Sequence, residues 1–315
     1  MPRPGPGQAL VRNLWFSFDP TQVLQMGAPR GQGGVPIGHV MKSFGTVSEV
    51  VESDLPAFRP GDLVRGESGW EDFSVIDGTG FIPTHPVPEG VPPNLALGTL
   101  GVTGMVAYFG MVEIGRPRAG ETCLVSAAAG GVGSIAVQVA RILGARTIGI
   151  TGGASKSGWL RDVLRLDGVI DHRSEDVAAR LTELCPDGVD VYFDNVGGPV
   201  LDLALERLRP QGRIVLCGIT SWYLAKETPP GPSGYGALIM KNGRMEGLLG
   251  RDYVARFPEA TKVMLGWLRD GRLHSEEDVA EGLENAPRSL ARMFAGENRG
   301  KQLLHLADPT PRRSG

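Results

Sequence analysis

The stretch of residues 122–143, TCLVSAAAGGVGSIAVQVARIL, constrains the fold of this chain more than any other. It opens with apolar residues at 123–125 that are typical of a buried strand. No side chain from 126 to 133 is larger than valine, so the backbone can turn tightly there. Apolar residues then recur at helical spacing up to residue 143, which predicts a helix. A turn that joins a strand end to a helix N-terminus has unpaired N–H groups and favours a phosphate.

The turn in this stretch resembles the dinucleotide-binding fingerprint G-x-G-x-x-G, with Ala128 in the place of the first glycine. A second apolar strand, at 146–151, follows the helix at the distance expected for a βαβ unit. We therefore predict that a nucleotide binds at this turn. The alternative, that the small residues only allow the helix to pack closely, stays open from the motif alone.

Strands and helices are expected to alternate between residues 99 and 272, which predicts an α/β fold with a doubly wound parallel sheet of the Rossmann type. Within it, Ser174 is expected to cap one helix and Gly271 to end another that begins near Pro258. Residues 1–98 show short strands with turn residues, and residues 273–315 are expected to return to that first, mostly β domain. The six expected strands of the parallel sheet are 122–127, 146–151, 168–171, 189–194, 212–218 and 245–249.

The composition excludes several classes of function. A net charge of -3 offers no basic surface for nucleic acid, so no nucleic-acid partner is expected. No apolar run is long enough to span a membrane, and the first residues lack the apolar core of a signal peptide, so we expect no membrane partner and a cytoplasmic location. The three cysteines are expected to be buried thiols, and neither they nor the isolated histidines have the spacing of a metal site.

The residues after the second strand indicate which dinucleotide is bound. NAD sites carry an acidic residue there to accept from the ribose 2′-OH, whereas this chain has Thr151, two glycines, Ala154, Ser155 and Lys156. A carboxylate would repel a 2′-phosphate, and a lysine can pair with it. We therefore predict NADP rather than NAD, although Lys156 read alone could be a solvated lysine at a helix start.

Two loops follow later strands of the predicted sheet. Asn195 lies in DNVGG, residues 194–198, and Tyr223 ends CGITSWY, residues 217–223. Both residue types are common in turns, but their place at the ligand-binding edge of the sheet favours contacts with a ligand. The Pro- and Gly-rich residues 224–236 are long enough to form a lid over a pocket or an inert surface loop.

With these residues in place, the chain resembles the medium-chain dehydrogenase/reductase superfamily. Within it, the chain is similar to the zinc-free branch of leukotriene B4 12-hydroxydehydrogenase, prostaglandin reductases and curcumin reductases. The resemblance covers nearly the whole chain and rests on FSFDPTQ, LGTLGVTGMVAYFG, AAAGGVG, GGASK, YFDNVGGPVLD, RIVLCG, RMEG and GENRGK. It implies a GroES-like catalytic domain at 1–98, a Rossmann NADP-binding domain at 99–272 and a return to the catalytic domain at 273–315.

The resemblance implies NADPH-dependent, zinc-independent reduction of the C=C bond of α,β-unsaturated ketones or aldehydes by a homodimer. Hydride goes to the β-carbon, and Tyr223 together with the nicotinamide ribose hydroxyl stabilises the enolate before it is protonated. The cofactor contacts that the resemblance implies are Gly130, Gly131, Val132 and Gly133 at the pyrophosphate, Lys156 and His172 at the adenosine phosphate, and Asn195, Cys217, Gly218, Ile219, Tyr223, Leu248, Leu249, Gly250 and Asn298.

Several departures from the family pattern bear on activity. His172 stands where a tyrosine is common, so NADPH affinity is expected to fall as the pH rises. Val106 replaces a threonine near the nicotinamide, and Val23 follows FDPTQ where an arginine is usual. Relatives carry further residues before PGPGQALVRN, so the first domain is expected to lack an opening hairpin. Two alternatives stay open: a quinone oxidoreductase of the same fold, and a non-catalytic NADPH-binding regulatory protein.

Overall fold

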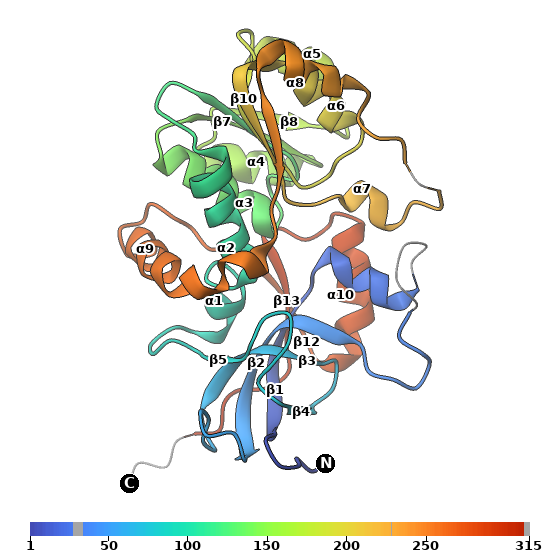
Figure 1. The fold of residues 1–315 in the computed structure, drawn as a ribbon, viewed down its shortest axis with the longest axis vertical. Coiled ribbons are helices and arrows are strands. Elements are labelled where there is room, and N and C mark those ends of the chain that lie inside the picture. Colours follow the sequence, from blue (N-terminus) through green and yellow to red (C-terminus); the bar gives the residue numbers. More distant parts are fainter. Residues whose placement is uncertain (28–33, 228, 312–315) are drawn as a thin grey trace. The chain divides into compact units, whose positions relative to one another are not determined.

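The computed structural model describes residues 1–27, 34–227 and 229–311 (Figure 1). They form two compact units. The first comprises Met1–Val102 and Glu276–Gly315, and the second comprises Thr103–Ser275. In the described residues, no helix combines the length and the apolar character that crossing a membrane requires.

The second unit is built on a six-stranded sheet in the order β11-β10-β9-β6-β7-β8, in which every pairing is parallel. This is the strand order of a Rossmann sheet, so the predicted fold class is confirmed. The fifth strand begins earlier than expected and has a register shift between Leu208 and Arg213. The strands are β6 (Thr122–Val125), β7 (Arg146–Thr151), β8 (Gly168–Asp171), β9 (Val189–Asp194), β10 (Leu208–Leu216) and β11 (Arg244–Gly247).

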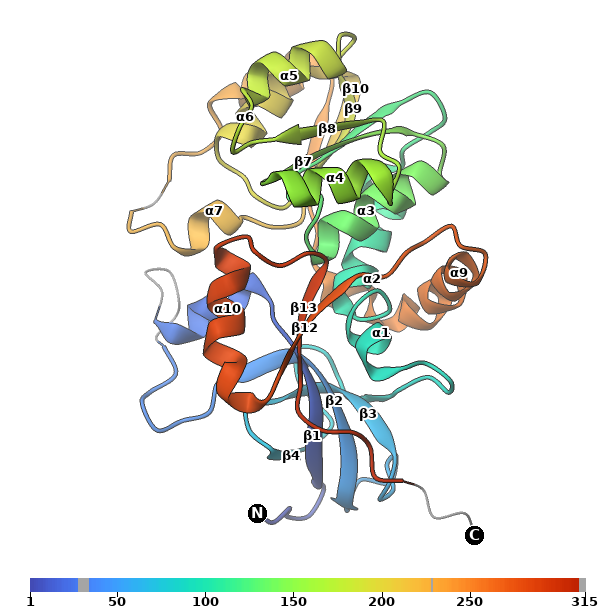
Figure 2. The same cartoon turned by 180° about the vertical axis from the view of Figure 1, so that it is seen from behind.

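Helices cover both faces of this sheet because successive strand residues point to opposite sides. Leu124, Tyr192 and Ile214 are buried in one cluster with residues of α5 (Val177–Leu184), α6 (Pro199–Glu206) and α8 (Gly236–Lys241). On the other face, Phe193 approaches Gly110 of η2 (Gly110–Gly115). The helix α4 (Ala154–Asp162) contacts β7 and β8, and α3 (Gly131–Ile142) contacts β6 and β7 (Figure 2). The strands β6, β7 and β9 are therefore buried on both sides, as their apolar residues require.

The ends of two helices test the capping expected from the sequence. The prediction for Ser174 is wrong: Asp176 caps α5, and its carboxylate accepts from the N–H groups of Ala178 and Ala179. The N–H of Ser174 instead donates to the carbonyl of Asp171 in the preceding turn, which holds Ser174 away from the helix start. The prediction for Gly271 is confirmed, since it follows α9 (Phe257–Arg269) with a left-handed φ of 67° that favours glycine.

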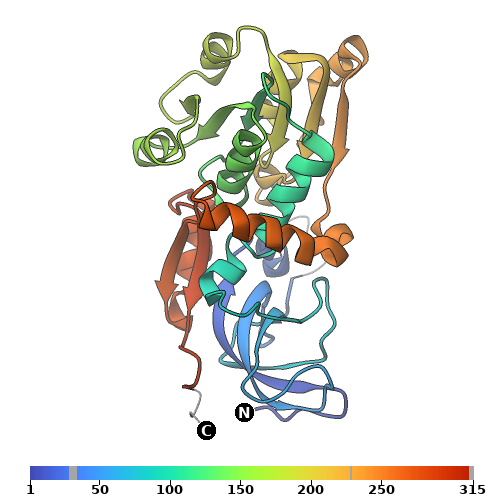
Figure 3. The same cartoon turned by 90° about the vertical axis from the view of Figure 1, so that its left-hand side faces the viewer.

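The longest helix of the second unit, α9, is seen as the long orange helix across the middle of Figure 3. Its Trp267 ring lies 5.8 Å from the ring of Tyr108, which belongs to α2 (Val102–Phe109). Phe109 of the same helix stacks on Tyr253 of η4 (Gly250–Arg256), with ring centroids 4.6 Å apart. These aromatic contacts attach the segment after β11 to α2.

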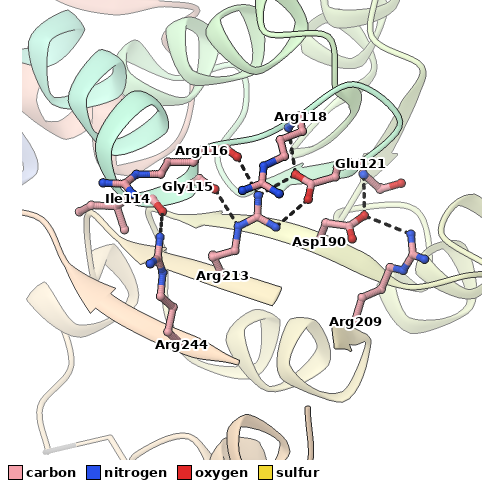
Figure 4. A network of polar contacts seen from close by, with 10 residues as sticks. Ile114, Gly115, Arg116, Arg118, Glu121, Asp190, Arg209, Arg213 and Arg244 are labelled. Atoms are coloured by element: carbon pink, nitrogen blue, oxygen red, sulfur yellow. Dashed lines mark hydrogen bonds and ion pairs between the residues drawn. The ribbon is translucent and has the colours of Figure 1, made fainter. Parts of the chain in front are cut away.

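The amino-terminal ends of the parallel strands are joined by charged side chains (Figure 4). Arg213 donates to both carboxylate oxygens of Glu121, at 3.0 and 2.6 Å, and to the carbonyls of Gly115 and Arg116. Asp190 accepts from the N–H of Thr122 at 2.8 Å. Burial by itself raises the pKa of Glu121, but the hydrogen bonds and charge of Arg213 outweigh it, and the pKa lies below its ordinary value. These contacts tie together the amino-terminal ends of the strands, whereas ligands of open α/β sheets bind outside the carboxyl ends.

The first unit is a mixed sheet in the order β12-β13-β1-β2-β3-β5, with β4 also paired to β1. Antiparallel pairing of Phe16 with Leu304 joins the two distant parts of the chain. Leu290 of the helix α10 (Ala286–Phe294) lies in one buried cluster with Phe16 and Leu304. The strands are β1 (Ala9–Ser17), β2 (Lys42–Ser53), β3 (Leu63–Gly69), β4 (Phe73–Ile76), β5 (His85–Pro86), β12 (Glu277–Glu281) and β13 (Lys301–His305), and the remaining segments are η1 (Pro20–Met26), α1 (Pro93–Leu97) and η5 (Leu283–Asn285).

Candidate functional site

The turn between β6 and α3 is shaped by very close backbone approaches. A Cβ atom on Gly133 would overlap the carbonyl of Ala127 and would lie 2.9 Å from the Cα of Ala128. A Cβ on Gly130 would lie 3.2 Å from the same carbonyl, a much milder contact. Because α3 begins at Gly131, its first N–H groups have no acceptor within the helix and can bind a phosphate. The turn therefore has the form that the sequence predicts for a pyrophosphate site.

The side chains of His172 and Arg173 lie over Gly152, just beyond the end of β7. A Cβ on Gly152 would lie 2.8 Å from Nε2 of His172 and 2.9 Å from Nε of Arg173, so the two side chains meet above this glycine. Lys156 lies half-buried in the first turn of α4. The place where an NAD site carries a carboxylate thus has three side chains that can carry positive charge, which suits a 2′-phosphate.

Asp171 holds the loops after β7 and β8 together. Its Oδ1 accepts from the N–H of Gly153 at 2.8 Å and from the N–H of Arg173 at 3.0 Å. The hydrogen bond from Gly153 is the largest cause that lowers the pKa of this carboxyl. The carboxylate therefore fixes the backbone on which His172 and Arg173 stand.

The loops after β9 and β10 lie at the same edge of the sheet. Asn195 is 7% exposed, and its amide Nδ2 donates to the carbonyl of Ser126 at 2.7 Å. The N–H groups of Cys217 and Gly218 both donate to the carbonyl of Asp194. Burial, and then the charge of Asp194, raises the pKa of the Cys217 thiol to about 12, so this thiol stays protonated at neutral pH. Tyr223 is the half-buried last residue of α7 (Thr220–Tyr223), and Ile219 before that helix is 39% exposed.

The last predicted contacts of the second unit follow β11. The N–H of Leu248 donates to the carbonyl of Leu216 at 2.9 Å, which continues the β10–β11 pairing. Leu249 is 43% exposed and Gly250 is buried. The structure thus brings every predicted cofactor residue of this unit to the carboxyl edge of one sheet. Their contacts with a cofactor stay a prediction.

Asn298 and Val106 complete the residues selected from the sequence. Asn298 belongs to the first unit, is 7% exposed, and donates from Nδ2 to the carbonyl of Gly300 at 2.9 Å. Val106 is half-buried on α2.

Of the loop at 224–236, residue 228 lies outside the described residues. The far end of the loop is attached to α6, because Asp202 accepts from Ser233 and Gly234. The lid role of this loop stays a prediction.

Sequence reasoning missed Arg173, Asp171 and Ser126. Arg173 directly follows His172 in the sequence, and its place beside a predicted phosphate contact was the signal that could have identified it. The other two look like ordinary loop polar residues until their hydrogen bonds are known. Among the residues that the structure describes, no three His, Cys, Asp or Glu side chains are grouped as a metal site requires.

Known families and proteins match almost the entire chain. The family model for zinc-binding dehydrogenases matches residues 131–266, and the model for the N-terminal domain of oxidoreductase matches residues 1–84. The NADPH-dependent curcumin reductase of Escherichia coli (strain K12) is 39% identical over 310 residues, covering 96% of this chain and 89% of that protein. The 2-alkenal reductase (NADP(+)-dependent) of Nicotiana tabacum is 38% identical over 308 residues, covering 96% and 88%. The crystal structure of CurA from Vibrio vulnificus in complex with NADPH superposes with a TM-score of 0.90 at 36% identity, covering 98% of this chain and 93% of that one.

Proposed function

Since the chain belongs to the medium-chain dehydrogenase/reductase superfamily, we propose that it uses NADPH to reduce the C=C bond of α,β-unsaturated ketones and aldehydes. The choice of NADPH as the cofactor is supported by the convergence of His172 and Arg173 over Gly152, where a 2′-phosphate needs positive charge. The relatives named above, which are reductases of curcumin and 2-alkenals, support the substrate class.

Different segments of the second unit bind different parts of the cofactor in this proposal. The N–H groups at Gly131, Val132 and Gly133 bind the pyrophosphate, because they are the first donors of α3. Lys156, His172 and Arg173 bind the 2′-phosphate. The segments that follow β9, β10 and β11 contact the nicotinamide half, through Asn195, Cys217 to Tyr223, and Leu248 to Gly250.

Tyr223 is the proposed catalytic residue. When bound, NADPH supplies the hydride that reduces the β-carbon of the substrate. Negative charge then develops on the carbonyl oxygen, and the phenol O–H of Tyr223 donates a hydrogen bond to it. The enolate that results takes a proton at its α-carbon, so the C=C bond becomes a single bond while the carbonyl remains.

The test is a panel of enones, enals and quinones with NADPH, followed by the loss of reduced-nicotinamide absorbance. Turnover of enones is expected, and Tyr223→Phe should lower kcat by about 100-fold at saturating NADPH, as for the loss of an oxyanion donor. Reduction of quinones alone would favour the quinone oxidoreductase. Binding of NADPH without turnover of any substrate would contradict the reductase and leave a non-catalytic NADPH-binding protein.

The protein is also proposed to be a homodimer through the edge strand β11. In the described part of the chain, β11 pairs only with β10, so one of its edges has free backbone donors and acceptors. Next to it, Tyr235, Ile239 and Met240 are 62%, 79% and 83% exposed, an unusual exposure for large apolar side chains. A second copy of the same edge would pair with the strand and cover these side chains.

The cytoplasmic location expected from the sequence stays a prediction.

A further inference from the structure

Asp194, the last residue of β9, is a completely buried carboxylate with very uneven hydrogen bonding. Its Oδ1 accepts from Ser126 Oγ at 3.1 Å, from the O–H of Tyr192 at 2.8 Å, and from the N–H groups of Val196 and Gly197 at 2.9 Å each. Among the described residues, its Oδ2 has no hydrogen-bond partner. Four donors from four different residues thus converge on one oxygen of Asp194.

Ser126 connects this carboxylate to the loop after β9. Its hydroxyl donates to Asp194 and accepts from the N–H of Asn195 at 2.9 Å. Its carbonyl accepts from the Asn195 amide, as described above. Ser126 is 1% exposed and stands directly before the β6–α3 turn. Any shift of Ser126 would therefore move the turn and the loop after β9 relative to each other.

The main chain of Asp194 also binds the loop after β10. The carbonyl of Asp194 accepts from Cys217 at 2.9 Å and from Gly218 at 3.0 Å. A Cβ on Gly218 would lie 2.9 Å from the carbonyl of Asn195, so these two loops also touch directly. One residue thus joins the ends of β6, β9 and β10.

We propose that Asp194 is a positioning residue for the cofactor: acting through Ser126, it sets the distance between the phosphate-binding turn and the loops that hold the nicotinamide half. Because Asp194 is completely buried, its side chain is not exposed to a ligand. This inference rests on the proposed function, because it assigns a role within the same site. Its consequence is that binding of a whole dinucleotide depends on this network, whereas binding of its 2′-phosphate end, at β7 and β8, does not.

Ser126→Ala and Tyr192→Phe form a matched pair of variants. Each removes one hydroxyl that donates to the same Oδ1, and both residues are fully buried. They differ in one respect, because only Ser126 adjoins the turn and binds Asn195. The O–H of Tyr192 donates to Asp194 and lies beside Ser126. A purely structural role predicts equal effects, and a positioning role predicts unequal ones.

The experiment measures the melting temperature of each full-length variant and its Kd for NADPH, from the fluorescence of the reduced nicotinamide. The Kd for adenosine 2′-phosphate is measured alongside by calorimetry. Ser126→Ala is expected to weaken NADPH by about tenfold, the effect of one hydrogen bond, and to leave adenosine 2′-phosphate within about twofold. Tyr192→Phe is expected to leave both ligands within about twofold, although its melting temperature also falls.

Equal loss of NADPH affinity in the two variants, or no loss in either, would overturn the inference. Parallel loss of both ligands in Ser126→Ala would also overturn it, because that indicates general loosening rather than misplacement. If Ser126→Ala does not fold, Ser126→Cys replaces it, since a thiol fills the same space but hydrogen-bonds weakly. Failure of the wild-type chain to bind NADPH would instead refute the proposed function, so the two failures are distinct.

Discussion

At the residue scale, the proposed discrimination between NADPH and NADH rests on the few side chains around Gly152. This glycine leaves room for His172 and Arg173, whose nitrogens would clash with any Cβ at that position. Lys156 lies in the first turn of α4, which begins two residues after Gly152. Cationic groups that bind a phosphate contribute only when the phosphate is present, so their removal separates the two cofactors.

We expect Lys156→Ala and Arg173→Ala each to raise the Kd for NADPH by about tenfold while changing the Kd for NADH by less than about twofold. Titration of both cofactors against each variant gives the measurement. Arg161→Ala is the control, because Arg161 is an exposed residue in the last turn of the same helix. Equal losses of NADPH and NADH would contradict the role given to these side chains.

At the element scale, the β6–α3 turn depends on one glycine much more than on its neighbour. A Cβ on Gly133 would overlap main-chain atoms of Ala127 and Ala128, which cannot move without displacing the strand end. Gly130 has φ -85° and ψ 177°, which any residue adopts, and only one contact at 3.2 Å. The two positions are therefore not equivalent, although both are glycines of the same fingerprint.

Gly133→Ala should destabilise the fold by about 1–3 kcal/mol and weaken NADPH, because α3 is pushed away from the turn. Gly130→Ala should cost less than about 1 kcal/mol, since its contact is relieved by a small shift. Denaturant unfolding and NADPH titration of both variants provide the comparison. A Gly130→Ala variant as unstable as Gly133→Ala would show that the backbone approaches described here do not govern the turn.

The opposite edge of the same sheet gives a prediction about acid stability. Glu121 and Arg213 are 20% and 13% exposed, so solvent screens their ion pair only in part. The folded pKa of Glu121 lies below its ordinary value of 4.5. A depressed carboxyl pKa stabilises the folded state above that ordinary value, and the contribution is lost as the pH falls through the folded pKa.

Glu121→Gln should therefore lower the free energy of unfolding by about 1–3 kcal/mol at neutral pH, and the gap to wild type should close as the pH falls below Glu121's ordinary pKa. Urea unfolding at several pH values measures it. Glu183→Gln is the control, because the Glu183 side chain, paired with Arg180, is 65% exposed and should contribute little. A gap that widens in acid would contradict the assigned ion pair.

At the scale of the whole molecule, the exposed apolar side chains beside β11 are where the proposed dimer would form. Ile239→Glu together with Met240→Glu would place two charges where a second copy is proposed to pack. We expect this variant to sediment as a monomer while wild type sediments as a dimer. Val163→Glu is the control, because Val163 is 46% exposed beside α4, at the β8 side of the sheet. A wild-type monomer would refute the proposed dimer.

Local patterns in the sequence were enough to predict the parallel sheet and the tight turn after its first strand. Alternation of apolar runs with helical spacing specifies strand and helix locally, and the small residues at 126–133 specify the turn, whatever lies elsewhere in the chain. The absence of a carboxylate after Thr151 is equally local, and it indicates NADP before any contact is known. The prediction that Ser174 caps α5 is wrong because Asp176, another residue suited to capping, stands closer to the helix start.

What only the tertiary structure decided is which distant side chains meet. Ser126 and Asp194 are 68 positions apart, and they touch because β6 and β9 are neighbours in the sheet while β7 and β8 lie beyond β6. The side chains of His172 and Arg173, which follow β8, reach Gly152 for the same reason, since β7 and β8 pair side by side. The physical cause is that local sequence sets backbone conformation, whereas strand order depends on the burial of both faces of the whole sheet. The turn can therefore be recognised from its residues, but the carboxylate proposed to align it cannot.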